Sequence, residues 1–277
     1  MRRLPAAIGR YPHTAALFDG RAPGPLDCAD IPVISRAFAP MVREARYAVS
    51  EMAIATFLQA LEHGKPLVLL PVALAGRFQE GALLCRADSG LTPATLAGAR
   101  IGVRAYSQTT GMWLRGILAS HGVAAETIRW TTFEDAHVPE YRDPPWASRA
   151  AAGHDMQAML EAGGLDAAIF GNDTPASTAL RPVFPHGAGE EFLRLHGFMP
   201  VNHLVVARAD VADADTLQEV TRQLDAAAAR APSGLPRGRA ALMPSLAFAS
   251  HFCARQGLIA RAPTYDEIWR GLPASIA

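Results

Sequence analysis

The sequence predicts an α/β protein of two lobes, each built on a mixed, mostly parallel sheet flanked by helices. The first observation is that short apolar runs alternate with helical patterns along the whole chain, as in βα units. The second is length, since 277 residues suit two lobes of about 100–150 residues each. The third is a pair of extended segments, near residues 76–87 and 203–209, that bracket a compact βαβ region.

These extended segments predict where the chain crosses between lobes. Lobe 1 is expected to be discontinuous and to combine residues 1–86 with 206–277, and lobe 2 is expected to span residues 87–205. Two crossings followed by returning helices are typical of clamshell binding proteins, which close around a ligand by hinge motion. The sequence therefore predicts a small-molecule cleft between the lobes.

Individual elements follow from apolar runs, helical periodicity and stop signals. The expected strands cover residues 6–8, 33–35, 47–49, 67–70, 82–85, 100–103, 128–131, 167–170 and 204–207. The expected helices cover residues 40–45, 51–63, 110–120, 155–162, 215–230, 244–256 and 265–270. Thr264 and Glu267 predict a capping box at the start of the last helix.

Composition restricts the possible partners. Lys+Arg and Asp+Glu both number 26, so the formal net charge is zero, which argues against a nucleic-acid partner. Three distant cysteines, Cys28, Cys85 and Cys253, favour a reducing compartment and buried apolar roles. No stretch approaches the roughly 18 apolar residues of a membrane span, and the N-terminal apolar run is too short for a signal peptide. We therefore expect a cytoplasmic protein with no membrane partner.

A polar turn between a strand and a helix is the clearest local signal. Tyr106, Thr109 and Thr110 follow the strand that ends near Val103, and the helix begins directly after them. Free backbone N–H groups and the positive end of the helix dipole would make this turn a site for a carboxylate or phosphate. Plain N-capping by a threonine explains the pattern equally well.

Two further junctions carry candidate ligand-binding residues. Ser50 and Glu51 stand where a strand is expected to give way to a helix, at the sheet edge where α/β proteins bind ligands. Their alternative role is helix capping and a favourable charge in the first turn. Asn172 and Asp173 follow another buried strand, where an Asx turn is the alternative.

His203 stands where a β run begins, and histidine exchanges protons readily near neutral pH. A structural histidine that ties the strand in place is the alternative. The other histidines show no metal-ligand spacing, although ligands can also converge from distant segments. The sequence contains no Walker A motif, no G-x-G-x-x-G after a strand and no G-x-S-x-G, so nucleotide binding and serine hydrolysis have no support.

Five segments, taken in order, resemble one known family. They are RYPHTAALFDG (10–20), similar to an opening Y-x-x-T-x-x-L-x-x-G; VSEMAIATFL (49–58); GVRAYSQTTGMWLRGIL (102–118), with Tyr106, Thr109, Trp113 and Arg115 in step; HGFMPVNHLVVAR (196–208); and HFCARQGLIARAPTYDEIW (251–269). Together they resemble the 4,5-dihydroxyphthalate decarboxylase family, which shares the fold of type II periplasmic binding proteins. The resemblance places His203 on the family's histidine.

The resemblance implies decarboxylation of a small hydroxylated aromatic carboxylate without a cofactor or metal. In that reading the polar turn anchors the carboxylate, Ser50 and Asn172 orient ring substituents, and His203 or Glu80 donates the proton. The far nitrogen of His203 is then expected to bond a partner such as a backbone carbonyl. The full set of expected substrate-binding residues is Ser50, Glu51, Tyr106, Thr109, Thr110, Asn172 and Asp173. The family habit also suggests a homodimer.

The chain departs from the family where Phe-Arg-His is expected after the fourth strand, because it reads Phe78-Gln79-Glu80. An amide and a carboxylate replace a cationic pair that would suit an acidic substrate. This departure favours another substrate, or a non-catalytic binding protein or sensor for a small anionic aromatic solute. Decarboxylase and binding protein therefore both remain open from the sequence.

Overall fold

The computed structural model describes residues 3–171 and 174–276, which divide into two compact units. Unit 1 combines residues 3–76, 201–247 and 262–276, and unit 2 combines residues 77–200 and 248–261, less the two that are not described. The chain leaves unit 1 after Gly76 and returns at Val201, so both crossings lie earlier than the sequence predicts. Residues 248–261 also join unit 2, which the sequence analysis did not anticipate.

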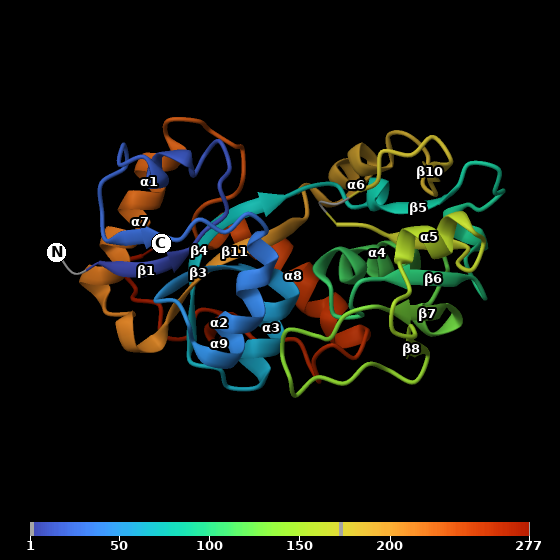
Figure 1. Cartoon of the computed structure of the whole chain (residues 1–277). Helices are drawn as coiled ribbons and strands as arrows, with labels where there is room; N and C mark the ends of the chain where they lie inside the picture. The colour runs from blue at the N-terminus through green and yellow to red at the C-terminus, as the bar shows by residue number, and fades with distance from the viewer. Residues whose placement is uncertain (1–2, 172–173, 277) are drawn as a thin grey trace. The chain divides into compact units, whose positions relative to one another are not determined.

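Unit 1 is built on a five-stranded sheet (Figure 1). In spatial order its strands are β2 (Leu26–Cys28), β1 (Leu4–Ala7), β3 (Val49–Ala53), β11 (Val201–Arg208) and β4 (Leu67–Gly76). β1 pairs in parallel with β2 and β3, whereas β11 pairs antiparallel with β3 and β4. The strand that returns from unit 2 is thus inserted in reverse beside the centre of the sheet.

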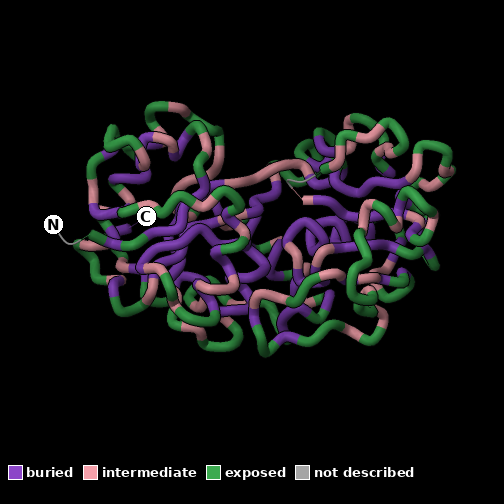
Figure 2. The backbone as a smooth tube through the Cα atoms, viewed as in Figure 1, coloured by how far each residue is buried: buried purple, intermediate pink, exposed green. Residues whose placement is uncertain are grey.

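Helices cover both faces of this sheet. The helical segments of unit 1 are α1 (Ala15–Phe18), η1 (Ile34–Ala37), α2 (Phe38–Glu44), α3 (Ile54–Glu62), η5 (Ala209–Val211), α7 (Ala214–Ala228), the start of α8 (Arg239–Arg255) and α9 (Tyr265–Ile268). Figure 1 shows α1 and α7 on one side of the strands and α2 and α3 on the other. Every residue of β3 is buried. Figure 2 shows the buried residues, in purple, gathered in the inner part of each unit.

Unit 2 is built on a six-stranded sheet. In spatial order its strands are β10 (Leu180–Pro182), β5 (Leu83–Arg86), β9 (Ala167–Ile169), β6 (Arg100–Val103), β7 (Arg129–Thr132) and β8 (Ala147–Arg149). β5 runs antiparallel to both of its neighbours, and the remaining pairs are parallel. The predicted α/β class with mixed, mostly parallel sheets is confirmed.

Two helices of unit 2 pack on opposite faces of its sheet. Its helical segments are η2 (Glu80–Ala82), η3 (Pro93–Thr95), α4 (Thr109–Ser120), η4 (Ala125–Thr127), α5 (Met156–Glu161), α6 (Ala188–His196) and the end of α8 (Arg239–Arg255). A Cβ added at Gly102 would meet Met156 of α5, whereas one added at Gly111 of α4 would meet the side chain of Val103. Since neighbouring strand residues point to opposite faces, α4 and α5 cover different sides.

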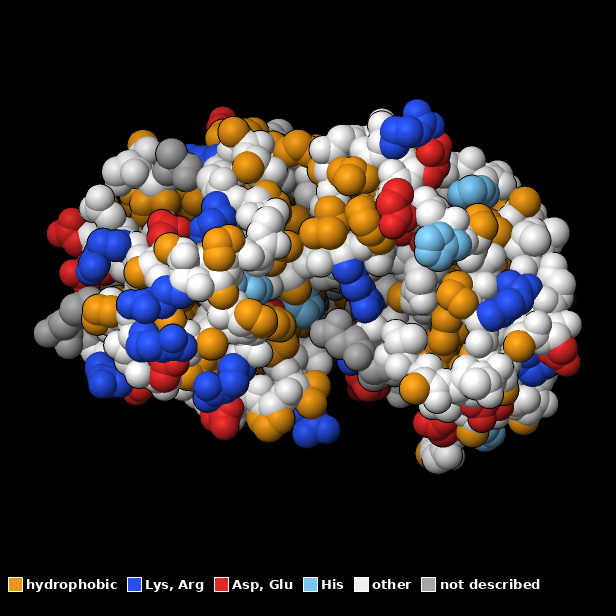
Figure 3. Space-filling view, turned by 90° about the horizontal axis from the view of Figure 1, so that it is seen from above, with side chains coloured by type: hydrophobic (Ala, Val, Ile, Leu, Met, Phe, Trp, Pro, Cys, Tyr) orange, Lys and Arg blue, Asp and Glu red, His pale blue; other side chains and the backbone are white. Residues whose placement is uncertain are grey.

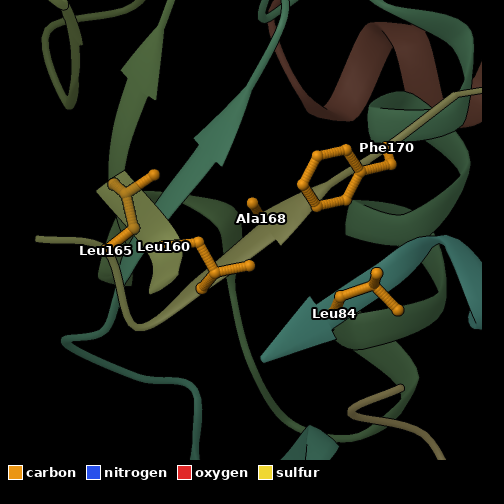
Figure 4. Close-up of a cluster of buried hydrophobic side chains, with 5 residues drawn as sticks. All are labelled: Leu84, Leu160, Leu165, Ala168 and Phe170. Atoms are coloured by element: carbon orange, nitrogen blue, oxygen red, sulfur yellow. The ribbon is translucent and has the colours of Figure 1, made fainter. Parts of the chain in front are cut away.

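An aliphatic cluster fixes α5 to the sheet (Figure 4). Leu160 of α5 packs with Leu84 of β5, Ala168 of β9 and the flanking Leu165 and Phe170, and all five side chains are buried. Truncating a leucine in such a cluster typically costs about 2–5 kcal/mol, since the lost transfer energy adds to a residual cavity. This cluster therefore stabilises the packing of α5 against the sheet of unit 2.

The structure corrects several predicted elements. The expected strand at residues 33–35 is wrong, because Ile34–Ala37 forms the 3-10 segment η1. The helix expected from Glu51 begins at Ile54, and residues 49–53 form β3. Three short strands, β2, β8 and β10, and the helices α1 and α6 were not predicted. The predicted capping box of Thr264 and Glu267 is confirmed at the start of α9.

Candidate functional site

The most organised polar cluster of unit 1 surrounds Glu51 in the middle of β3. The Glu51 side chain is fully buried and accepts three hydrogen bonds. The Gly9 amide donates to Oε2 at 2.8 Å, and the Tyr11 hydroxyl donates to Oε1 at 2.7 Å. Nδ1 of His203 lies 2.6 Å from the same Oε1. Three donors around one carboxylate satisfy it without solvent.

Sheet register brings Glu51 and His203 together. β11 pairs antiparallel with β3 so that Val205 faces Glu51 and His203 faces Ala53. Residues two apart on a strand share a face, so His203 and Glu51 are diagonal neighbours on one face of the sheet. A sequence separation of 152 residues is thus closed by a single strand pairing.

The Tyr11 side of the cluster is held by a tight loop. The Tyr11 amide donates to Oγ1 of Thr14 at 2.8 Å, and that hydroxyl donates to the Gly9 carbonyl at 2.6 Å. A Cβ added at Gly9 would lie 2.7 Å from the Tyr11 ring and hydroxyl. Glycine at position 9 therefore lets the ring cross close over the backbone and reach Glu51.

Burial fixes the protonation of two groups in this loop. Burial, reinforced by the Glu51 charge, raises the pKa of Tyr11, so its hydroxyl remains a donor. Burial lowers the pKa of His13, whose Nε2 lies 3.1 Å from the Leu74 carbonyl. Because that carbonyl only accepts, Nε2 of the neutral His13 carries the hydrogen. The His13 ring stacks on Tyr11 with centroids 5.3 Å apart.

The two ring nitrogens of His203 differ: Nδ1 contacts a carboxylate and, among the described residues, Nε2 does not. Nδ1 contacts Glu51, the Phe38 ring packs edge-on at 5.1 Å, and the side chain keeps 14 % of its exposure. Within the described part of the chain, no residue hydrogen bonds to Nε2. A carboxylate on Nδ1 favours the tautomer whose Nε2 accepts a proton, and balances the charge once it has done so. The expected carbonyl partner of His203 is therefore replaced by Glu51.

Ser50 points to the other face of β3, since strand neighbours alternate. Its buried hydroxyl donates to the Glu51 carbonyl at 2.8 Å. The predicted capping role of Ser50 is wrong, because Ala53 is the N-cap of α3. Its binding role stays a prediction, as does that of Glu51.

In unit 2 the predicted polar turn leads into α4, whose first residues are Thr109 and Thr110. Gln108 stands at the N-cap and makes no side-chain capping bond, so the threonine caps are not formed. Arg77 reaches this helix start: it donates to Oγ1 of Thr110 at 3.1 Å and to the Gly171 carbonyl at 2.8 Å. A guanidinium beside a helix N-terminus suits an anion. Arg77 was not predicted from the sequence, although it directly precedes the Phe78-Gln79-Glu80 segment that differs from the decarboxylases.

Tyr106 lies in the core of unit 2. Its hydroxyl accepts a hydrogen bond from Trp146, and its ring lies under the Arg115 guanidinium at 3.9 Å. Arg115 in turn donates to the Tyr106 carbonyl at 2.6 Å and to the Gln256 side chain at 2.8 Å. Tyr106 and Arg115 thus hold the turn in place through contacts in the core of unit 2. Direct ligand contact by Tyr106 stays a prediction.

The remaining predicted residues are placed as follows. Glu80 opens η2 in unit 2 and is buried. Asn172 and Asp173 lie outside the described residues. Among residues 3–171 and 174–276, no group of three or more His, Cys, Asp or Glu side chains could hold a metal ion. In the same residues, no helix is long and apolar enough to cross a membrane.

Two proteins named as decarboxylases are similar in sequence to this chain. A 4,5-dihydroxyphthalate decarboxylase of Comamonas testosteroni is 28% identical over 233 residues, which cover 76% of this chain and 69% of the relative. One of Pseudomonas putida is 29% identical over 136 residues, or 46% of this chain and 51% of the relative. The chain resembles 4,5-dihydroxyphthalate decarboxylases. No protein-family model matches it.

Solved structures confirm the fold expected from that resemblance. The periplasmic aliphatic sulphonate binding protein SsuA of Escherichia coli superposes with a TM-score of 0.56 at 16% identity, over 98% of this chain and 79% of SsuA. A protein of Bordetella bronchiseptica gives 0.53 at 15% identity, over 100% and 91%. The desulfurization enzyme DSZB, bound to biphenyl-2-sulfinic acid, gives 0.50 at 19% identity, over 99% and 85%. At these identities the likeness shows the fold alone.

Three residues of the cluster that were not predicted as site residues lie in a motif of the resemblance. Tyr11 and Thr14 are the tyrosine and threonine of the opening Y-x-x-T motif, and His13 stands between them. In the sequence this motif contributes to the resemblance to the decarboxylases, and no site was predicted at it. Its hydrogen bonds to Glu51 and Gly9 show that a weak motif can mark a polar cluster.

Proposed function

We propose that this protein decarboxylates a small hydroxylated aromatic carboxylate without a cofactor, and that the Glu51–His203 pair moves the proton. The observation that carries the proposal is the 2.6 Å contact between a fully buried carboxylate and a histidine whose second nitrogen is available. The two related decarboxylases supply the reaction class.

The chemistry needs one group that takes and returns a proton. Nε2 of neutral His203 accepts the proton of a ring hydroxyl, which leaves an electron-rich phenolate. The imidazolium then protonates the ring carbon that bears the carboxylate. The ring–carboxylate bond breaks, its electron pair restores the phenolate, and CO2 leaves; solvent returns the hydroxyl proton. One substrate carboxylate and one proton thus give one arene and one CO2.

Glu51 acts through His203 in this scheme. Its Oε1 fixes the imidazole orientation and stabilises the imidazolium through a fully buried negative charge. Tyr11 and the Gly9 amide hold the carboxylate in place from the other side. Proton transfer by a positioned side chain contributes typically about 10²–10⁴-fold to the rate, so loss of His203 has a measurable consequence.

The carboxylate-binding role predicted for the polar turn belongs to unit 2. Arg77 adds a positive charge beside Thr110 there, which supports that role more strongly than the threonines alone. A cleft between the lobes as the place of binding stays a prediction from the sequence, as does the homodimer.

The test is CO2 release from hydroxybenzoates and hydroxyphthalates incubated with the pure protein and no added cofactor. We expect CO2 from at least one substrate with a hydroxyl ortho or para to the carboxylate. His63→Gln is the matched control for His203→Gln, because His63 is an exposed histidine of unit 1. Binding of these acids without CO2 release would support the non-catalytic binding protein instead.

A further inference from the structure

Unit 2 contains a cavity of about 660 Å³ that is separate from the Glu51–His203 cluster. It lies among the C-terminal half of α4, the 124–126 segment, the 184–196 segment with α6, and the end of α8. All its lining residues belong to unit 2. A volume of this size is within the usual range of about 300–1,000 Å³ for small-molecule sites.

Aromatic rings form the walls of the cavity. The lining phenylalanines are Phe184, Phe192, Phe248 and Phe252. Phe248 and Phe252 meet edge-to-face with centroids 5.9 Å apart, and His121 packs edge-on against Phe184 at 5.6 Å. Such walls favour a flat aromatic ligand, which gains from edge-to-face and offset contacts as well as from burial.

Two lining residues each have a buried polar atom without a hydrogen-bond partner among the described residues: Nη1 of Arg115, a donor, and Oε2 of Glu80, an acceptor. Glu80 is 4 % exposed, and its Oε2 has no hydrogen-bond partner among the residues that the structure describes. Burial raises the pKa of Glu80, and the nearby Glu190 charge raises it further. A buried acceptor without a partner costs about 1–3 kcal/mol. A ligand that donates a hydrogen bond to Oε2 would remove that cost.

The rim is polar and exposed. Its side chains include Glu191, His186, His196 and Arg255. Figure 3 shows histidine and acidic side chains beside hydrophobic ones on a face of unit 2. An apolar interior with few polar groups and a wet rim is the usual anatomy of a ligand pocket.

We propose that this cavity binds a small aromatic molecule with a hydrogen-bond donor, a phenol or an arylalkylamine, whose ring lies among the phenylalanines and whose donor reaches Oε2 of Glu80. The two sources share one chemistry, a flat ring with a hydrogen-bond donor. An aromatic carboxylate has no donor for Oε2 of Glu80 and would place a second acceptor beside it. This second site is independent of the proposed decarboxylation.

The test is calorimetric titration of the full-length protein with phenol, benzylamine and benzoate. We expect phenol or benzylamine to bind more tightly than benzoate, and the tighter of the two identifies the donor. Two variants locate the site. Glu80→Met removes the acceptor at similar volume, and Ala119→Trp places a bulky ring at an exposed lining position. Ala226→Trp, at an exposed alanine of α7 in unit 1, is the matched control.

Both lining variants should weaken the affected binding at least about tenfold, which corresponds to one hydrogen bond or one blocked ring site. The control should leave it unchanged. Binding that survives Ala119→Trp undiminished would overturn the proposal, and so would the absence of binding by both probes. Because Ala119 is exposed, this variant decides the matter even if Glu80→Met does not fold. Binding that occurs in the Glu51–His203 cluster would respond to His203→Gln and not to Ala119→Trp.

Discussion

Glu51 of unit 1 and Arg115 of unit 2 are both buried charged side chains, but their hydrogen-bond partners differ in kind. In unit 1, Glu51 is bonded by Tyr11 and His203, both of which carry exchangeable protons, and His203 keeps a nitrogen available. In unit 2, Arg115 is bonded by the Tyr106 carbonyl and the Gln256 amide and lies on an aromatic ring. Gln256 in turn donates to the Met112 carbonyl.

This difference distinguishes the Glu51 cluster, which can move a proton, from the Arg115 cluster, which stabilises the fold of unit 2. The partners of Arg115 are neutral acceptors that do not titrate, and they tie α8 to α4 and the polar turn. The partners of Glu51 include a histidine, a side chain that can both accept and donate a proton. Burial of a charge is therefore not by itself a sign of catalysis, and the chemistry of the partners decides.

The largest expected effect is on stability, from Arg115→Met. Loss of two hydrogen bonds to a charged donor leaves the Tyr106 carbonyl and the Gln256 side chain buried without their partner. We expect a loss of roughly 3–4 kcal/mol in the free energy of unfolding. Urea denaturation monitored by far-UV circular dichroism measures it. A loss below about 1 kcal/mol would contradict the claim that Arg115 stabilises the fold of unit 2.

The next effect is on turnover, from His203→Gln. Glutamine keeps a hydrogen bond to Glu51 but cannot exchange a proton, so kcat should fall about a hundredfold or more while substrate affinity and Tm stay close to those of the wild type. CO2 release under substrate saturation gives kcat, and thermal unfolding gives Tm. A variant with a much lower Tm and nearly normal kcat would instead identify a structural histidine.

Several elements around these residues could be predicted from the sequence, but the pairing of Glu51 with His203 could not. β6 (Arg100–Val103) and the α9 capping box were predicted at their observed positions, because apolar runs and caps are local signals. Glu51 and His203 were each singled out, but only the β3–β11 register joins them, and register is not local.

Other elements were missed for physical reasons. β2, β8 and β10 have three residues each, too few for an alternating pattern to be recognised. The helix start was placed at Glu51 because Ser50-Glu51 looks like a cap. Pairing with β11 instead continues the strand to Ala53, so tertiary contacts override the local preference.

An intermediate effect is expected from Gly9→Ala. The added Cβ would meet the Tyr11 ring at 2.7 Å, so the ring must shift and its hydrogen bond to Glu51 is lost. We expect turnover to fall about tenfold, in line with one hydrogen bond of about 1.4 kcal/mol. Tyr11→Phe removes the same bond without the clash. The two variants should therefore give similar kcat values, and a normal rate in Tyr11→Phe would show that this bond does not position Glu51.

The smallest effect concerns pH and His13. Burial lowers the pKa of His13, so the unfolded chain binds a proton at higher pH than the folded protein does. The stability from neutral His13 is thus fully present above the unfolded pKa of about 6.5 and is lost as pH falls through the folded pKa. His13→Gln keeps a donor for the Leu74 carbonyl without titrating. Below about pH 6.5, the variant's free energy of unfolding should fall less steeply than that of the wild type; equal slopes would contradict this.

The central claim is that Glu51 and His203 act as one unit, and a double-mutant cycle on turnover tests it most directly. The cycle compares kcat for the wild type, Glu51→Gln, His203→Gln and the double variant with the substrate that releases CO2. If Glu51 acts only through His203, the double variant should be about as slow as His203→Gln alone, so the two losses do not add. Losses that multiply, or a Glu51→Gln variant with wild-type turnover, would contradict the account.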